Sequence, residues 1–213
     1  MVLVVDAEIG YSRGVVLHRA RFHVAPGEAL LVRGPNGVGK STLLSTIAGV
    51  RRPLRGSVNV RGSRATASAA KRSIGYVTDP PHLFEELSPG EHLELARSLW
   101  AAAKVPSNGA DLSGRILDRT PDLPAAMLSL GQRKRVGIAL GLLHAPPLWV
   151  LDEPFNGLDA SSVDVLRGLM IGHLARGGAV VCATHDEKAL EAIEPRVLDL
   201  GIAAATRISG TTP

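Results

Sequence analysis

The chain has 213 residues, of which 45% are hydrophobic and 21% are charged, and its formal net charge at pH 7 is +4. A chain of this size with dispersed apolar residues is expected to bury one large core, which excludes a disordered protein and two independent domains. Its one cysteine, Cys182, excludes an internal disulfide framework and a cysteine-rich metal site, and we expect a packed core thiol. The cations form no long run and no apolar run could span a bilayer, so we expect a cytoplasmic protein without a nucleic-acid partner.

Short β-branched runs alternate with longer helical patterns along the chain, which predicts an α/β fold with a mainly parallel central sheet. Residues 57–60 are an exception, because together with the first strands they are expected to form a small antiparallel patch at one edge. The runs with strand character are residues 2–5, 29–34, 73–77, 148–151 and 179–184.

A helical lobe is expected to interrupt the sheet. Ser88 is placed to cap its first helix, a proline occupies the first helical position, and Glu91 can return a hydrogen bond to the cap nitrogen. No confident strand lies between about residues 88 and 124, and residues 104–114 are expected to form a loop. The expected division is a catalytic core with the antiparallel patch over residues 1–78 and 134–213, and a helical lobe over residues 79–133.

The sequence GPNGVGKST follows an apolar strand and precedes a helical stretch, which is the context of a phosphate-binding loop. Its glycines let backbone N–H groups turn toward a phosphate, and the positive end of the next helix adds to the field. Lys40 is expected to bridge the β- and γ-phosphates and Ser41 to ligate magnesium, whereas a glycine-rich turn that only caps a helix is the alternative. The residues expected to bind nucleotide here are Gly34, Pro35, Asn36, Gly37, Val38, Gly39, Lys40, Ser41 and Thr42.

Two acids follow the apolar run LWVL. Asp152 is placed to hold magnesium, and Glu153 to orient or deprotonate an attacking water, although an exposed turn after a strand is the simpler alternative. The next β run is expected to end at His185, with Asp186 as a helix cap. Because adjacent parallel strands end at one edge of a sheet, Asp152 and His185 should lie together there. The other six histidines show no shared spacing and are expected to be structural.

In their order along nearly the whole chain, these motifs resemble the nucleotide-binding domain of ABC transporter ATPases, a P-loop NTPase. The matching segments are Walker A at residues 34–42, the signature LSLGQ at 128–132, Walker B LWVLDEP at 148–154, the D-loop at 156–159 and the switch histidine His185. The resemblance implies ATP hydrolysis with ATP and Mg²⁺ as cofactors, and stacking of adenine on Tyr11.

The resemblance also implies partners. Ser129, Gly131 and Gln132 of the signature would contact ATP held by a second copy of the chain or a related ATPase subunit, and Asp159 would communicate across that seam. Ser129 is also a natural helix cap, as is Asp159. The ATPase pair would dock on separate transmembrane permease subunits, which would place it peripherally on the inner face of the cell membrane.

The sequence departs from the family pattern at two positions. Leu130 replaces the third residue of the signature, which is usually glycine, and Asp79 replaces a glutamine that links the nucleotide to the helical lobe. An aspartate is shorter and only accepts hydrogen bonds when ionised, but it could touch magnesium directly or through water. After the signature, Arg135 matches a basic family position, whereas Arg133 and Lys134 are expected to be solvated.

Several alternatives stay open at this point. Three apolar residues that follow Asp79 in the sequence have two possible roles. They are expected either to contact a cytoplasmic helix of the permease or to form a hydrophobic staple at the start of the helix capped by Ser88: Leu83, Phe84 and Leu87. The compact chain is similar to the small standalone ATPases of bacterial exporters, including the haem exporter of cytochrome c maturation. A soluble ABC-type ATPase, as in iron–sulfur cluster assembly, and a weakly hydrolysing, nucleotide-gated binding module are the competing functions.

Overall fold

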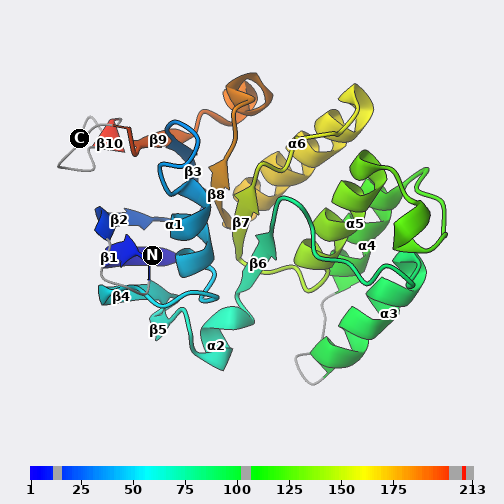
Figure 1. Cartoon of the computed structure of the whole chain (residues 1–213), viewed down its shortest axis with the longest axis horizontal. Coiled ribbons are helices and arrows are strands. Elements are labelled where there is room, and N and C mark those ends of the chain that lie inside the picture. Colours follow the sequence, from blue (N-terminus) through cyan, green and yellow to red (C-terminus); the bar gives the residue numbers. More distant parts are fainter. Residues whose placement is uncertain (12–15, 102–106, 202–207, 210–213) are drawn as a thin grey trace.

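The computed structural model describes residues 1–11, 16–101, 107–201 and 208–209, and it contains two sheets with helices between and beside them (Figure 1). The central sheet has the strand order β10-β9-β3-β8-β7-β6, and all neighbours are parallel except β10 and β9. The predicted α/β fold with a mainly parallel sheet is therefore confirmed. The strands of this sheet are β3 (Ala29–Arg33), β6 (Ile74–Val77), β7 (Leu148–Asp152), β8 (Ala179–Ala183), β9 (Arg196–Asp199) and β10 (Ile208–Ser209).

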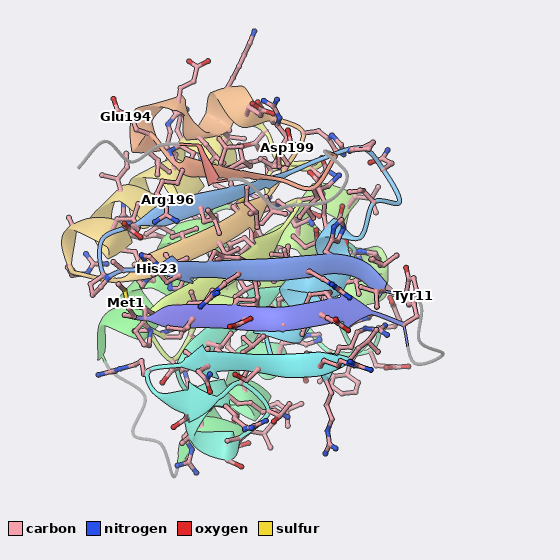
Figure 2. All side chains as sticks on the ribbon, turned by 90° about the vertical axis from the view of Figure 1, so that its left-hand side faces the viewer. Met1, Tyr11, His23, Glu194, Arg196 and Asp199 are labelled. Atoms are coloured by element: carbon pink, nitrogen blue, oxygen red, sulfur yellow. The ribbon has the colours of Figure 1, made fainter. Side chains whose placement is uncertain are left out.

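The second sheet is antiparallel and has the order β2-β1-β4-β5. Residues in β1 alternate between buried and exposed, as expected for a strand with one covered face. The predicted antiparallel patch is confirmed, but it is a separate sheet and not an edge of the central one. Figure 2 shows its outer face. Its strands are β1 (Leu3–Gly10), β2 (Val16–Val24), β4 (Arg55–Val60) and β5 (Ser63–Arg64).

The helices cover both faces of the central sheet. Helix α1 contacts strands of both sheets and fills the space between them, whereas α5 and α6 lie on the other face (Figure 1). Strands β7 and β8 are buried along their whole length, as parallel strands covered on both faces should be. The helices are α1 (Lys40–Ile47), α2 (Ser68–Lys71), α3 (Pro89–Trp100), α4 (Ser107–Leu117), α5 (Leu130–Leu142) and α6 (Ala160–Ala175), with 3₁₀ segments η2 (Ala125–Met127) and η3 (Glu187–Ile193).

The helical lobe begins as predicted. Ser88 Oγ accepts a hydrogen bond from the Glu91 amide, and the Glu91 carboxylate accepts one from the Ser88 amide. The predicted loop at residues 104–114 is wrong over residues 107–114, which belong to α4, and its first three residues lie outside the described part of the chain. Leu112 and Ile116 lie one helical turn apart and are buried against α5 and α6, so tertiary packing outweighs the turn-forming residues at the start of α4.

In the described part of the chain, no strand lies between residues 88 and 124. None of the helices in the described part of the chain is both long enough and apolar enough to cross a bilayer. Cys182 is buried in β8, as predicted.

Candidate functional site

The segments that follow β3, β7 and β8 meet at the carboxyl edge of the central sheet, because these strands are parallel neighbours. A cavity of about 280 Å³ lies at this edge. It brings together much of the predicted phosphate-binding loop, the two acids at the end of β7 and one aromatic residue. The lining residues are Tyr11, Asn36, Gly37, Gly39, Lys40, Ser41, Thr42, Asp152 and Glu153.

The loop before α1 is built to present backbone N–H groups to this cavity. Gly39 precedes α1 at φ 109°, in the region that favours glycine, and a Cβ there would lie 2.9 Å from Leu17 Cδ1. Within the described part of the chain, no side chain caps the start of α1, whereas Ser88, Ser129 and Asp159 cap α3, α5 and α6. The free N–H groups and the helix dipole make the start of α1 suited to bind an anion.

Lys40 adds a cation at the same place. It is 8% exposed, and its Nζ donates to Gly34 O at 2.8 Å and to Pro35 O at 3.4 Å. The same Nζ lies 3.4 Å from His185 Nε2. Buried positive charge, uncapped N–H groups and open volume therefore coincide, which is the requirement for binding a phosphate chain.

Asp152 and Ser41 place oxygen atoms beside this cavity. Burial raises the pKa of Asp152, and so do the nearby carboxylates of Glu153 and Asp79, whereas a hydrogen bond with Ser41 and the charge of Lys134 lower it without cancelling the rise. This anion is thus only partly compensated by the protein. A carboxylate and a hydroxyl oxygen are ligands that Mg²⁺ accepts. Among the described residues, no cluster of three or more His, Cys, Asp or Glu could hold a metal, so Mg²⁺ here would also need ligands from phosphate and water.

Glu153 follows Asp152 in an unusual backbone conformation, with φ 42°. Its amide donates to Ala183 O at 2.8 Å, and its Oε2 accepts from the His185 amide at 3.1 Å. The carboxylate is therefore held at the cavity by β8 and the segment after it. Strand β8 ends at Ala183, so the expectation that the β run continues to His185 is wrong by two residues. Asp186 accepts from the Ala189 amide and caps η3, as predicted.

His185 connects Glu153 with the phosphate-binding loop. Its Nε2 lies 2.8 Å from Asn36 Oδ1 and 3.4 Å from Glu153 Oε1. The structure thus brings the predicted switch histidine into contact with Glu153 and with the phosphate-binding loop, and its role in catalysis stays a prediction.

Tyr11 and His18 approach the loop from the antiparallel sheet. Tyr11 lies at the end of β1 opposite Met1, it is 46% exposed, and the Arg51 guanidinium lies 5.6 Å from its ring centroid (Figure 2). Adenine stacking on this ring stays a prediction. His18 Nε2 lies 2.6 Å from Val38 O within the phosphate-binding loop. The sequence contains no signal for this contact, because His18 lies on β2 of the antiparallel sheet and Val38 lies in the loop that follows β3 of the central sheet.

The signature residues lie outside the cavity of the phosphate-binding loop. Ser129 and Gln132 form a reciprocal capping box at the start of α5, so the predicted cap is confirmed. They line a second cavity of about 500 Å³ that shares no lining residue with the first among the residues described. Its other lining residues are Leu130, Gly131, Arg135, Gly157, Leu158, Asp159 and Ser162.

The D-loop packs closely against the signature. A Cβ on Gly131 would lie 2.3 Å from Gly157 O, so this backbone contact requires glycine at position 131. The Asp159 carboxylate accepts a hydrogen bond from the Ser162 amide at 2.8 Å and caps α6. Hydrogen bonds from the backbone and the side chain of Ser162 lower the pKa of Asp159. Leu130, where the family pattern has glycine, is 80% exposed and adds an apolar side chain to this surface.

The expectation that Arg133 and Lys134 are solvated is wrong. Arg133 donates to both carboxylate oxygens of Glu85, at 2.7 and 2.6 Å. Lys134 is only 2% exposed, and its Nζ lies 2.7 Å from Asp79 Oδ1. Asp79 Oδ2 accepts from Asn156 Nδ2 at 3.0 Å, and a contact of Asp79 with magnesium stays a prediction. Sequence reasoning missed the pair because helix α5 turns Lys134 toward a residue that is distant in the chain.

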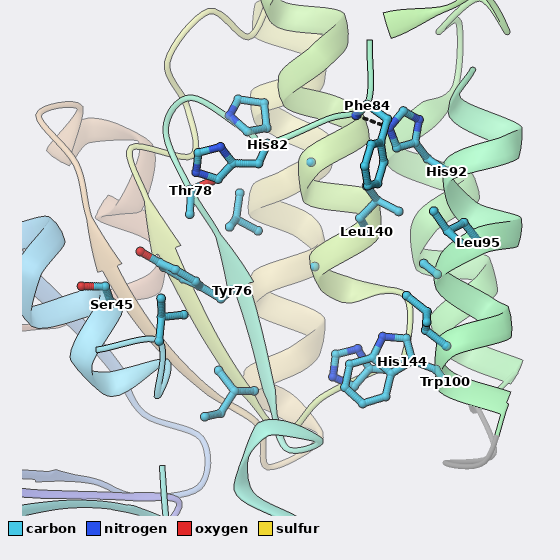
Figure 3. Close-up of a pocket in the computed structure, with 18 residues that line it drawn as sticks. Ser45, Tyr76, Thr78, His82, Phe84, His92, Leu95, Trp100, Leu140 and His144 are labelled. Atoms are coloured by element: carbon cyan, nitrogen blue, oxygen red, sulfur yellow. Dashed lines mark hydrogen bonds between the residues drawn. The ribbon is translucent and has the colours of Figure 1, made fainter. Parts of the chain in front are cut away.

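A larger cavity of about 660 Å³ separates the helical lobe from the core (Figure 3). Phe84 and Leu99 line it and are 60% and 76% exposed, whereas Leu83 and Leu87 are half-buried. The Phe84 amide donates to His92 Nε2 at 3.0 Å, which fixes one wall. At the other end Trp100 stacks on His144 with ring centroids 4.2 Å apart. Burial lowers the pKa of His144 to about 4, so this ring is neutral at pH 7.

Comparisons with known proteins cover all of these segments. Residues 17–156 match a family model described as "ABC transporter". The "Cytochrome c biogenesis ATP-binding export protein CcmA" of Rhodobacter capsulatus is 39% identical over 202 residues, which are 94% of this chain and 88% of the relative. The protein of the same description from Xanthomonas axonopodis pv. citri is 37% identical over 185 residues, or 86% of each chain. A solved "Structure of ATP binding subunit of ABC transporter" superimposes with a TM-score of 0.83 at 29% identity, covering 98% of this chain and 90% of the other.

Proposed function

Because the chain belongs to the ABC transporter family and is an ATP-hydrolysing transporter subunit, we propose that the cavity at the start of α1 binds ATP with Mg²⁺. One observation carries this proposal. The uncapped start of α1, the buried Lys40 ammonium and the Ser41–Asp152 pair all face the same space. We also assign residues 1–78 and 134–213 to the core and residues 79–133 to the helical lobe.

The residues divide the work of phosphoryl transfer. Lys40 and the loop amides bind and orient the β- and γ-phosphates, so the γ-phosphorus is fixed relative to the protein. Ser41 and Asp152 hold Mg²⁺, which supplies positive charge to the phosphate oxygens. Glu153 accepts the hydrogen bond and then the proton of the attacking water. His185 keeps the Glu153 carboxylate aimed at the cavity through two contacts.

A second ATPase subunit completes each site. The signature and D-loop residues line a cavity of their own and do not reach the phosphate-binding loop of the same chain. We propose that two subunits associate head to tail, so that Ser129, Gly131 and Gln132 of one meet the γ-phosphate bound by the other. Asp159 lines the same cavity as these residues and would lie at the interface between the two subunits.

The groove between core and lobe fits a membrane partner. It is mainly apolar, and two of its large apolar side chains, Phe84 and Leu99, are exposed to solvent. We propose that a cytoplasmic helix of a transmembrane permease subunit fills this groove, because the relatives reported above are export proteins. The chain would then act peripherally at the inner face of the membrane.

The names of the relatives also suggest the process, and we propose that this chain powers an export step of cytochrome c biogenesis. Isolation of the tagged chain from native membranes tests the assignment. Recovery of a transmembrane subunit, and loss of covalently haem-bearing cytochrome c in cells that carry Lys40→Ala, are the expected results. Recovery of a scaffold complex without a membrane subunit would favour iron–sulfur assembly. Turnover no higher than that of Glu153→Gln, with or without the partner, would favour a binding module.

A further inference from the structure

Lys134 is a buried cation in the first turns of α5, and it contacts two segments of the catalytic core. Its Nζ donates to Asp79 Oδ1 at 2.7 Å and to the backbone oxygen of Glu153 at 3.1 Å. Asp79 follows β6 and Glu153 follows β7, so one ammonium group joins the ends of two neighbouring strands to the helix that carries the signature. Its low exposure shields these charge-assisted bonds from water.

The backbone of Glu153 needs such support. Its φ of 42° lies in the left-handed region, which a side chain with a Cβ adopts only when surrounding contacts impose it. The amide of Glu153 is held by Ala183 O, and the carbonyl is held by Lys134. The two bonds fix the peptide groups on either side of the Cα atom, and these groups set the direction of the carboxylate.

Asp79 in turn fixes Lys134. One carboxylate oxygen binds the Lys134 ammonium, and the other accepts from Asn156 Nδ2 at 3.0 Å. Asn156 is the first residue of the D-loop, three residues after Glu153, and its backbone amide donates to Glu153 O at 3.3 Å. The side chains of Lys134, Asp79 and Asn156 therefore form a chain of bonds that begins and ends at the segment containing Glu153.

The same helix also positions the signature. Gln132 and Ser129 cap α5 only a short distance before Lys134, and Gly131 packs on Gly157. A displacement of α5 therefore changes the bonds on Glu153 O and the signature surface together.

We propose that Lys134 and Asp79 form a positioning pair that holds Glu153 in its productive conformation. Through this pair, the conformation of Glu153 depends on the position of α5, the helix that carries the signature. This proposal rests on the proposed role of Glu153 in hydrolysis. The pair acts through Glu153 and does not touch the reacting atoms. A purely structural pair, in which Lys134 only neutralises the Asp79 carboxylate, is the competing explanation.

Neutral variants separate the two explanations. Lys134→Met removes the ammonium and leaves the Asp79 charge uncompensated, whereas Asp79→Asn combined with Lys134→Met removes both charges. Under our proposal kcat for ATP falls by ~10- to 100-fold in both variants, while KM for ATP stays within about threefold, because Glu153 is misplaced and the phosphate-binding loop is intact. The thermal midpoint should fall in the single variant and recover in the double variant. Stability and turnover are then uncoupled, which a structural role does not produce.

Arg133→Met is the matched control, because Arg133 also pairs with an acid, and within the described part of the chain its side-chain hydrogen bonds go to Glu85 and to Ala125 O. Its kcat should stay within about threefold of the wild type. Wild-type kcat in the double variant, or an equal loss in Arg133→Met, would overturn the positioning pair. Glu153→Gln is assayed alongside. Wild-type turnover in Glu153→Gln would refute the proposed function itself, whereas low turnover there with wild-type kcat in the double variant refutes only the pair.

Discussion

The Glu153 carboxylate contacts both the backbone and the ring of His185. Oε2 accepts from the His185 amide at 3.1 Å, and Oε1 lies 3.4 Å from Nε2. The same Nε2 lies 2.8 Å from Asn36 Oδ1, so the imidazole joins the segment after β7 to the phosphate-binding loop. With the proton on Nε2, the ring donates toward an amide oxygen and a carboxylate. The two contacts of His185 with Glu153 can be tested separately, because a substitution at position 185 removes the ring contact and keeps the backbone contact.

Glu153→Gln should trap an ATP-bound pair of subunits. The amide has the shape of the carboxylate but cannot accept the proton of water, so hydrolysis should fall by ~10²- to 10⁴-fold while ATP binding persists. Light scattering after gel filtration with saturating ATP measures the mass. A protein that stays monomeric under these conditions would contradict the head-to-tail sandwich.

His185→Ala should lower kcat by roughly 10²-fold and change KM for ATP little, because it removes the ring contact but keeps the backbone amide on Glu153. His23→Ala, at an exposed histidine on β2, is the matched control (Figure 2). Steady-state ATPase assays of the two variants suffice. Equal activities would show that the ring does not hold the carboxylate for catalysis.

Lys40→Ala should weaken ATP binding by at least ~30-fold, since a buried cation facing the phosphates is lost. Lys71→Ala, at an exposed position at the end of α2, should bind ATP like the wild type. Titration with a fluorescent ATP analogue gives both dissociation constants. Unchanged affinity in Lys40→Ala would place the nucleotide elsewhere.

The stability of the fold should depend on pH through His173. Its ring stacks on Trp149 at 4.0 Å, and burial lowers its pKa to about 4 from an ordinary value of 6.5. The unfolded chain therefore binds more protons between these values, and the free energy of unfolding falls as pH drops from 6.5 toward 4. The expected loss is up to ~1.4 kcal/mol per pH unit for each such histidine, and His144 contributes in the same direction.

His173→Phe should reduce that slope in urea unfolding between pH 6.5 and 4, because the ring keeps its stacking and no longer titrates. His23→Phe leaves a buried histidine at position 173 and should keep the full slope. Parallel curves for the wild type and His173→Phe would show that protonation of His173 is not linked to unfolding.

Leu99→Asp should release the membrane partner and leave ATP binding unchanged, because Leu99 lines the groove, far in the chain from the phosphate-binding loop, and is 76% exposed. Ile171→Asp also places a charge at an exposed apolar position, on α6 and outside the groove. Recovery of the transmembrane subunit from native membranes is compared for the two. Equal recovery would exclude the groove as the docking surface.

Features that depend on neighbours in the sequence could be predicted from the sequence. The phosphate-binding loop, the two acids at the end of β7 and the capping boxes at Ser88 and Ser129 follow from residue types at short spacing, because backbone turns and helix caps are local structures. The general rule about parallel strands brings the ends of β7 and β8 to one edge of the sheet, with Asp152 opposite Ala183, but the residue that His185 contacts there is Glu153.

The tertiary structure alone decided the contacts between segments that are distant in the chain. Helix α4 forms where a loop was expected, since α5 and α6 provide an apolar surface for Leu112 and Ile116. Lys134 is buried because α5 turns it toward Asp79, 55 residues away, and no local pattern distinguishes it from a solvated lysine. Burial and long-range electrostatics depend on what the rest of the chain places around a residue. Residue types and their spacing therefore specify which chemical groups this protein carries, whereas the packing of distant segments specifies which of these groups meet.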